Sequence, residues 1–329
     1  MHPAISVVLL TVLIGVGQGL FLALFTAHSY ALFGLLPVQD GQRFYAVGSL
    51  MVLAFMSAGL FASFFHLGRP ERAWRSAAQW RSSWLSREVL VLPVFMGAVA
   101  LYALAQWLAW KPVVAILPSG RAVDATVLLG TLAWLLSFAL FACTGMIYAC
   151  LRFLREWHTP LTVINYLMLG GASGFTLAAA FASANAPELT GFFAGWALII
   201  TVLAWLNRVA MLARNARLGR KPMSSLQTAI GIKHPQIRQT ALGFMGGSFN
   251  TEEFFHHASR RVLLSFRGFF LLAAFAVPAA LLAMALSSAS ATTLTLAFVV
   301  QFAGVLSERW YFFAEAKHPQ NLYYAGVGE

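Results

Sequence analysis

The chain has 329 residues, of which 60% are hydrophobic and only 10% are charged. Soluble domains carry about a quarter charged residues, so this composition excludes a soluble globular protein and predicts an integral membrane protein. The 22 Lys and Arg outnumber the 11 Asp and Glu, but they lie between apolar runs, which indicates membrane topology and not nucleic-acid binding. Cys143 and Cys150 are too few for a disulfide framework or for an iron–sulfur cluster within this chain.

Apolar stretches long enough to cross a bilayer as helices recur along the whole chain. A transmembrane barrel would need alternating segments of about ten residues, and the sequence has none, so we expect an all-α protein. The first stretch follows no basic segment and is too long for a cleavable signal peptide. The eight predicted transmembrane helices are 4–34, 44–65, 88–109, 122–147, 161–183, 190–213, 263–286 and 290–314.

Basic residues divide unequally between the two sides of the predicted bundle. The side that holds both termini carries 18 Lys and Arg, whereas the other side carries three, which are Arg43, Lys111 and Arg121. The positive-inside rule therefore places both termini in the cytoplasm. We expect one polytopic membrane domain over 1–329, with a cytoplasmic loop over 214–262 as the candidate docking surface for a partner and for anionic lipid.

Several small and polar residues interrupt the apolar spans. The pairs Gly15-xxx-Gly19 and Gly170-xxx-Gly174 allow close approach of helices, and packing explains them without a site. Gln18 lies midway along the first span, where an interhelical hydrogen bond is its simplest role. Glu308 and Arg309, at the end of the last span, are expected to pair with each other or with lipid headgroups.

Two ionisable residues lie at the edge of the hydrocarbon, where burying a charged side chain costs free energy, so they are candidate site residues. His66 closes the second span and Glu88 opens the third, and the loop between them is short enough for the two helix ends to be neighbours. An imidazole beside a carboxylate in poor solvent is suited to exchanging protons near neutral pH. The alternative is structural: an interfacial histidine, and a glutamate paired with Arg87.

The loop between these two residues combines tryptophans with arginines. That composition predicts a short amphipathic helix in the headgroup layer, with Trp74 and Arg81 about two turns apart on one face. The simplest role of such a helix is structural, as part of the aromatic belt. It could also form one wall of a pocket for an amphipathic ring that enters from the lipid. The residues of this kind are Arg72, Trp74, Arg75, Trp80, Arg81 and Trp84.

The histidines do not follow the pattern of a transmembrane cytochrome, which needs axial pairs at both depths of the membrane. His28 is the one histidine toward the side with few basic residues, so two stacked haems are not expected. A single haem near the basic side is the alternative that stays open, but no two intramembrane histidines face each other by an obvious pattern, so no haem is expected. The sequence also has no phosphate-binding loop, zinc site or Ser-His-Asp arrangement. We therefore do not expect this chain to act alone on a polar substrate.

Several motifs are similar to those of the DMSO reductase membrane-anchor family. The resemblance runs from the N-terminus to about residue 180 and resumes near the end of the last span. It rests on His2-Pro3-Ala4 with 15–21, Phe65-His66-Leu67-Gly68-Arg69-Pro70, Ser83-Trp84-Leu85-Ser86-Arg87-Glu88, Met146-Ile147-Tyr148-Ala149, Glu156-Trp157-His158-Thr159-Pro160 and 308–315.

The resemblance implies a complex of three subunits in the bacterial cytoplasmic (inner) membrane. A molybdopterin catalytic subunit would pass electrons to a ferredoxin-like subunit with iron–sulfur clusters, both on the cytoplasmic side, and this chain would exchange them with membrane quinone, either menaquinone or ubiquinone. The motifs at the two ends of the chain favour the branch that serves cytoplasmic sulfite dehydrogenases, with quinone as the electron acceptor. The alternative within the family is a DMSO-type reductase anchor that oxidises quinol.

The resemblance also assigns roles to residues. The quinol-site histidine and glutamate of the family fall on His66 and Glu88, which would exchange protons with the quinone. As our own mechanistic hypothesis, not from the resemblance, Trp84 would stack on the ring, and Arg72 and Arg87 would tune the carboxylate by opposite charge. Ser86 and Gln18 complete the quinone-binding candidates, and no metal ligand is predicted.

Two rival functions remain open from the sequence. A secondary transporter would also have many spans and polar groups in the membrane, but it usually shows internal repeats with helices broken at corresponding positions. Pro278 has no clear counterpart in the first half beyond Pro93. A purely structural anchor would hold the partner subunits without quinone chemistry, so that His66 would not affect electron flow.

Overall fold

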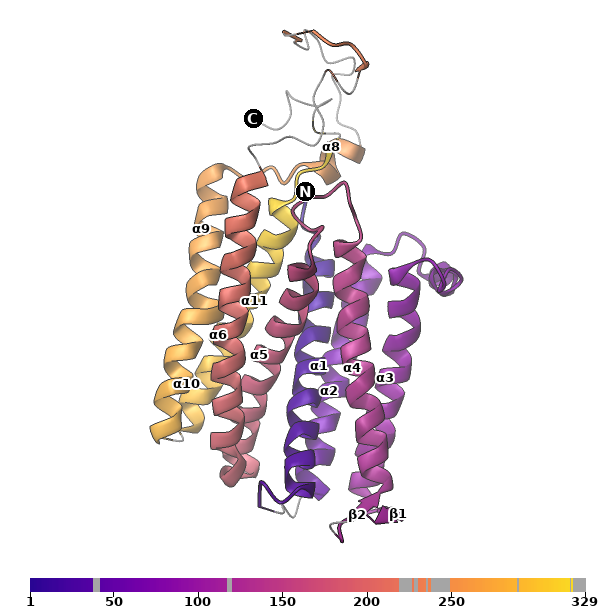
Figure 1. Ribbon diagram of the computed structural model, residues 1–329, viewed down its shortest axis with the longest axis vertical. Helices are drawn as coiled ribbons and strands as arrows, with labels where there is room; N and C mark the ends of the chain where they lie inside the picture. The colour runs from indigo at the N-terminus through magenta and orange to yellow at the C-terminus, as the bar shows by residue number, and fades with distance from the viewer. Residues whose placement is uncertain are drawn as a thin grey trace.

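The computed structural model confirms the all-α fold and its eight long apolar helices (Figure 1). The residues that it describes are 1–37, 42–116, 120–218, 227, 230–234, 236–237, 249–288, 290–319 and 321. The long helices are α1 (Ile5–Leu32), α2 (Gln42–Ser63), α3 (Trp84–Trp107), α4 (Ala125–Ala149), α5 (Pro160–Asn185), α6 (Pro187–Leu218), a seventh built from α9 (Arg260–Leu271), η3 (Leu272–Ala276) and α10 (Val277–Ser288), and α11 (Ala291–Glu315).

Short elements mark the two ends of this bundle. One end, here called the proximal end, carries Met1 and α8 at the top of Figure 1. The amino group of Met1 donates to the carbonyl oxygen of Ala316 at 2.8 Å, so the chain begins beside the end of α11. The opposite, far end carries an antiparallel hairpin. The short elements are η1 (Phe64–His66), η2 (Pro70–Ala77), β1 (Val113–Ile116), β2 (Ala122–Asp124) and α8 (Phe249–Phe254).

The two glycine pairs meet each other at the centre of the bundle, where α1 packs against α5. A Cβ atom added to Gly19 would lie 1.9 Å from the carbonyl oxygen of Gly170, and one added to Gly174 would lie 2.1 Å from the carbonyl carbon of Gly19. Only glycine allows backbones this close. The prediction that packing explains both motifs is confirmed, and the contact joins α1–α4 to the helices that follow.

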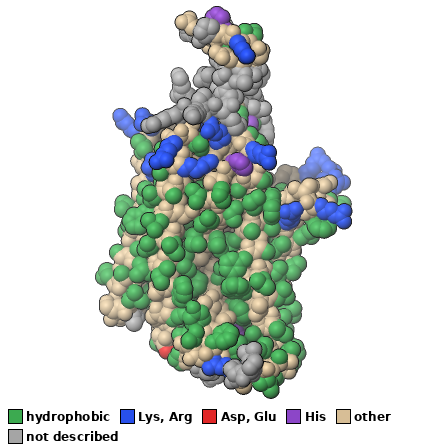
Figure 2. Space-filling model, in the orientation of Figure 1, with side chains coloured by type: hydrophobic (Ala, Val, Ile, Leu, Met, Phe, Trp, Pro, Cys, Tyr) green, Lys and Arg blue, Asp and Glu red, His purple; other side chains and the backbone are tan. Residues whose placement is uncertain are grey.

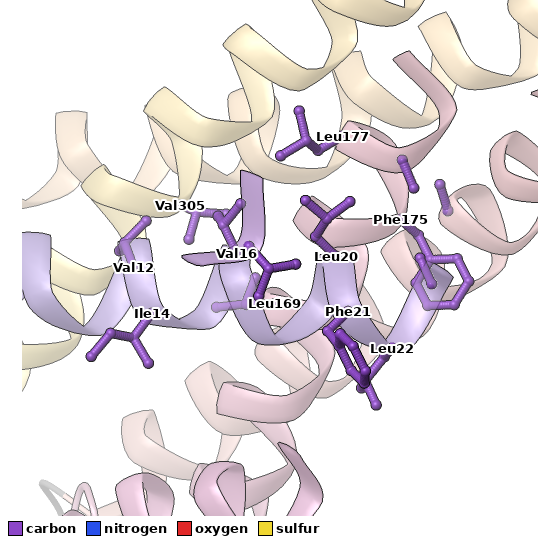
Figure 3. Packing of buried hydrophobic residues seen from close by; sticks show 14 of the residues in the cluster. Val12, Ile14, Val16, Leu20, Phe21, Leu22, Leu169, Phe175, Leu177 and Val305 are labelled. Carbon is purple, nitrogen blue, oxygen red and sulfur yellow. The ribbon is translucent and has the colours of Figure 1, made fainter. Parts of the chain in front are cut away.

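Around this contact the core consists of aliphatic and aromatic side chains from α1, α5 and α11, among them Val16, Leu169 and Val305 (Figure 3). The outer surface is equally apolar: Leu135 and Leu206, for example, are exposed. Figure 2 shows these hydrophobic side chains as a broad belt, with Lys and Arg gathered at the proximal end of the visible face. A bundle that is apolar inside and outside is expected when lipid is the solvent.

The seventh transmembrane helix is irregular at its centre, where η3 is a π-helical turn. Pro278 has no backbone N–H, so it cannot donate the helical hydrogen bond to the carbonyl of Ala274, four residues earlier. The side chain of Gln301 on α11 donates to that carbonyl at 3.3 Å and to Thr201 Oγ1 on α6 at 3.0 Å. A neighbouring helix thus satisfies the backbone group that proline leaves unpaired, as a membrane requires.

Two helix boundaries differ from the predicted spans in ways that affect the site. Helix α3 begins at Trp84, four residues earlier than predicted, because the Ser83 hydroxyl caps it by accepting from the Ser86 N–H at 3.4 Å. Helix α6 continues to Leu218, well beyond the predicted end. Of the predicted cytoplasmic loop over 214–262, residues 219–226, 228–229, 235 and 238–248 lie outside the described residues.

Candidate functional site

Glu88 lies one turn inside α3, near the proximal end of the bundle. Its carboxylate accepts a hydrogen bond from the Thr144 hydroxyl on α4, and its side chain is partly buried. Because α3 starts at Trp84, Glu88 is about 6 Å along the helix axis from its first residue. A carboxylate at this depth, held by a neutral hydroxyl, is available for proton exchange with a ligand at the helix end.

His66 ends η1, the short continuation of α2, and its side chain is exposed. Within the described residues it makes no hydrogen bond or ion pair, and none joins it to Glu88. Helix α2 packs against α3, so the two residues belong to adjacent helices at the same end of the bundle. The structure therefore places them at the same end of the bundle, with no hydrogen bond or ion pair between them among the described residues.

Arg87 holds the start of α3 together and does not pair with Glu88. Its Nε donates to the carbonyl of Trp80 at 2.9 Å and its Nη2 donates to the carbonyl of Arg81 at 2.8 Å. The guanidinium lies 4.3 Å from the centre of the Trp84 ring. The alternative in which Arg87 pairs with the glutamate is wrong, because unpaired carbonyls in the preceding turn bind the guanidinium instead.

Among the described residues, none of three other predicted residues forms a hydrogen bond or ion pair with Glu88. Arg72 is exposed, with its Nε 3.9 Å from Glu71 Oε1, so any influence on Glu88 acts over a longer range than an ion pair. Ser86 is buried in the capped first turn of α3. Gln18 is buried about 20 Å along α1 from the proximal end, much deeper than Glu88. That Gln18 binds the same quinone ring as His66 stays a prediction.

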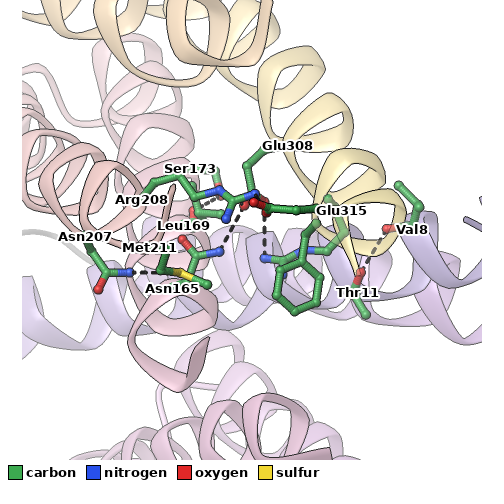
Figure 4. A network of polar contacts seen from close by, with 12 residues as sticks. Val8, Thr11, Asn165, Leu169, Ser173, Asn207, Arg208, Met211, Glu308 and Glu315 are labelled. Carbon is green, nitrogen blue, oxygen red and sulfur yellow. Dashed lines mark hydrogen bonds and ion pairs between the residues drawn. The ribbon is translucent and has the colours of Figure 1, made fainter. Parts of the chain in front are cut away.

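A buried ionic network between α5, α6 and α11 is a feature that the sequence reasoning missed (Figure 4). Arg208 Nε lies 2.8 Å from Glu308 Oε1, and both side chains are 0% exposed. Arg208 Nη2 is 3.6 Å from Glu315 Oε2, and Asn165 Nδ2 donates to Glu308 Oε1 at 3.1 Å. Arg208 lies within the predicted span 190–213, and α6 continues for ten residues beyond it. The sequence reasoning did not single it out as a buried charge.

Arg309 extends the same network. The expected pairing of Glu308 with Arg309 is present, at 3.7 Å between Oε2 and Nη2, although both side chains are buried and face away from the headgroups. The guanidinium of Arg309 also lies 3.8 Å from the centre of the Tyr166 ring. Two arginines and two glutamates balance each other, so the network needs no further ion to be neutral and ties the proximal halves of three helices together.

The far end of the α1–α4 group contains a cavity of about 370 Å³, lined by residues that include His28, Tyr45, Gln106 and Arg121. His28 Nδ1 is 3.0 Å from the Tyr102 hydroxyl, and Gln106 is only 1% exposed. Within the described residues the side-chain amide of Gln106 and the hydroxyl of Tyr45 have no hydrogen-bond partner. The sequence did not predict this cavity, because it collects single residues from distant parts of the chain.

Comparison with known proteins agrees with this architecture. A family model described as DMSO reductase anchor subunit (DmsC) matches residues 1–324. A sulfite dehydrogenase subunit from Allochromatium vinosum is 54% identical over 327 residues, which cover 99% of this chain and 100% of that protein. With its eight transmembrane-length helices, the chain is a multi-pass membrane anchor subunit of a multi-subunit oxidoreductase. The chain belongs to the DMSO reductase anchor subunit family.

Proposed function

We propose that this subunit passes electrons from an iron–sulfur partner subunit to membrane quinone, in a complex whose molybdopterin subunit oxidises sulfite. The observation that carries the proposal is the 54% identity to the sulfite dehydrogenase subunit from Allochromatium vinosum, over nearly the whole of both chains. The anchor holds the complex at the membrane, and its own chemistry is confined to quinone. No haem or iron–sulfur cluster is assigned to this chain.

His66 and Glu88 are the residues that we assign to proton exchange with the quinone. Reduction of a quinone takes up two electrons and two protons, so a site needs proton donors beside the two carbonyl oxygens. The exposed imidazole of His66 is free to donate to one carbonyl, and Glu88, held by Thr144, would relay protons to the site. Trp84 is the first residue of α3, one turn before Glu88. Its indole offers a surface on which the quinone ring could stack.

We place the proximal end in the cytoplasm of a bacterium, with the partner subunits docked there. The support is the unequal charge: basic residues gather at this end, and few lie at the far end. Electron entry and proton uptake would then occur at the same face of the membrane. Quinone reduction by this route moves no net charge across the bilayer.

A second position for the quinone has one observation in its favour, the far-end cavity. Its volume falls within the usual range for ligand sites, and its unpaired amide and hydroxyl groups could bind carbonyl oxygens. We favour the proximal end because a cluster-bearing partner on the cytoplasmic side is then closest to the ring. A DMSO-type anchor would use the same proximal site in the opposite direction, to oxidise quinol.

Purification through a tag on this chain, in mild detergent from native membranes, tests the proposed complex. We expect molybdenum and iron in a fixed ratio to this chain, and sulfite-dependent reduction of a soluble quinone by the purified material. Intact chain without either metal would contradict the complex and favour the transporter alternative. Both metals with activity toward DMSO and quinol, but not sulfite, would favour the reductase alternative.

A further inference from the structure

The segment between η1 and α3, residues 69–81, is an exposed and strongly cationic part of the proximal end. It is here called the arginine–tryptophan segment. Four arginines stand against one glutamate, Glu71, and all of them are exposed. Two indole rings are exposed as well, Trp74 by 70% and Trp80 by 52%. The arginines are Arg69, Arg72, Arg75 and Arg81.

This segment projects sideways from the bundle and not upward from it. In Figure 1 the turns beside the start of α3 lie at the level of the proximal helix ends, and Figure 2 shows basic side chains there, outside the apolar belt. That level is where the headgroups of a surrounding bilayer lie. Tryptophan is enriched at this depth, and arginine reaches toward phosphates from it.

The segment is attached rigidly to α3. Arg87 of α3 binds the carbonyls of Trp80 and Arg81, and η2 packs against the same helix. A rigid attachment matters because a ligand that binds the segment does not have to order a flexible loop.

Two of the arginine side chains, Arg75 and Arg81, are presented to the surroundings with their hydrogen-bonding edges free. The guanidinium of Arg75 lies 5.6 Å from the Trp74 ring centre, and that of Arg81 lies 5.3 Å from the Trp80 ring centre. Stacking on a ring uses the face of a guanidinium and leaves its N–H groups at the edge, which match the oxygens of a phosphate. In the described part of the chain neither arginine has an ion-pair partner.

We propose that the arginine–tryptophan segment is a binding site for the headgroups of anionic phospholipids. Its guanidinium edges bind the phosphate, and Trp74 and Trp80 insert at the boundary of the acyl chains. Each basic residue near an anionic membrane surface strengthens binding by roughly fivefold. The lateral position and the exposed indoles favour lipid over a protein partner, since a partner above the bundle would meet the proximal end from the aqueous side.

Lipid selectivity of the whole complex in phosphatidylcholine nanodiscs tests this proposal. The probes are spin-labelled phosphatidylglycerol and spin-labelled phosphatidylcholine, and the measured quantity is the ratio of their motionally restricted fractions. The test variant is Arg72→Gln/Arg75→Gln/Arg81→Gln. The matched control is Arg152→Gln/Arg260→Gln/Arg261→Gln, which removes three exposed charges elsewhere at the proximal end.

We expect the preference for phosphatidylglycerol to fall at least tenfold in the test variant and by less than twofold in the control. In the unmodified complex, about 0.5 M salt should reduce the preference strongly, because salt screens exposed charges; this measurement does not depend on whether a variant folds. Equal losses in both variants, or an unmodified complex without a preference, would overturn the proposal. Loss of the iron–sulfur subunit with unchanged lipid selectivity would assign the segment to protein docking instead.

Discussion

Replacing His66 by leucine is expected to lower sulfite-dependent quinone reduction by about 100-fold or more, the usual range for loss of a general acid–base group. The imidazole is exposed and has no hydrogen bond or ion pair within the described residues, so its removal should not disturb the helices around it. Reduction of a soluble one-electron acceptor that takes electrons directly from the partner subunits should stay unchanged. Both rates are measured on the same purified complex.

The matched control is His257→Asn, at an exposed histidine of the proximal end outside the proposed site. Its backbone φ is 52°, a conformation that asparagine tolerates better than most residues. This variant should keep the normal rate of quinone reduction. Near-normal turnover in His66→Leu would refute the role of His66 and favour a purely structural anchor. An equal fall with the soluble acceptor would locate the defect in the partner subunits.

Glu308→Leu should destabilise the protein more than any loop substitution. The change removes the partner of the buried Arg208 guanidinium at 2.8 Å, leaving Glu315 at 3.6 Å. It also removes the partner of the buried Arg309 at 3.7 Å. Breaking a buried ion pair by removing one partner costs about 3–5 kcal/mol. The thermal midpoint of the detergent-solubilised complex, followed by size-exclusion chromatography, should fall clearly, together with the yield.

The double variant Arg208→Met/Glu308→Leu tests whether the loss of stability comes from leaving Arg208 without its partner. Apolar side chains of similar size can replace a buried ion pair at little cost, so the double variant should recover part of the stability lost in the single one. The recovery is partial because Arg309 and Glu315 each still lose a partner. A double variant that is no more stable than Glu308→Leu would show that the loss does not come from leaving Arg208 without its partner. Unchanged stability in the single variant would show that the pair contributes nothing.

Hydropathy predicted the number of helices correctly because the length of an apolar run is a direct physical requirement of the bilayer. It did not predict where helices end. Ser83 starts α3 four residues early through a cap that no hydropathy pattern records, and this moves Trp84 and Glu88 onto one helix. The contact between the two glycine pairs was predictable in kind, since small residues at this spacing have few other uses.

The parts of the structure that the sequence did not predict depend on long-range packing. The partners of Arg208 could not be predicted, because Glu308 and Glu315 lie about a hundred residues away in the sequence. The far-end cavity joins His28, Tyr45 and Gln106 from three helices in the same way. His66 and Glu88 could be named in advance because each is an ionisable residue at the edge of its own apolar span.

Photolabelling of the intact complex with an azido-quinone tests most directly where quinone binds. The label is identified by peptide mass spectrometry, with and without an excess of unmodified quinone as competitor. A quinone site at the proximal end predicts competed label within residues 64–88. Competed label confined to peptides that contain His28, Tyr45 or Gln106 would contradict that site and move the quinone to the far-end cavity.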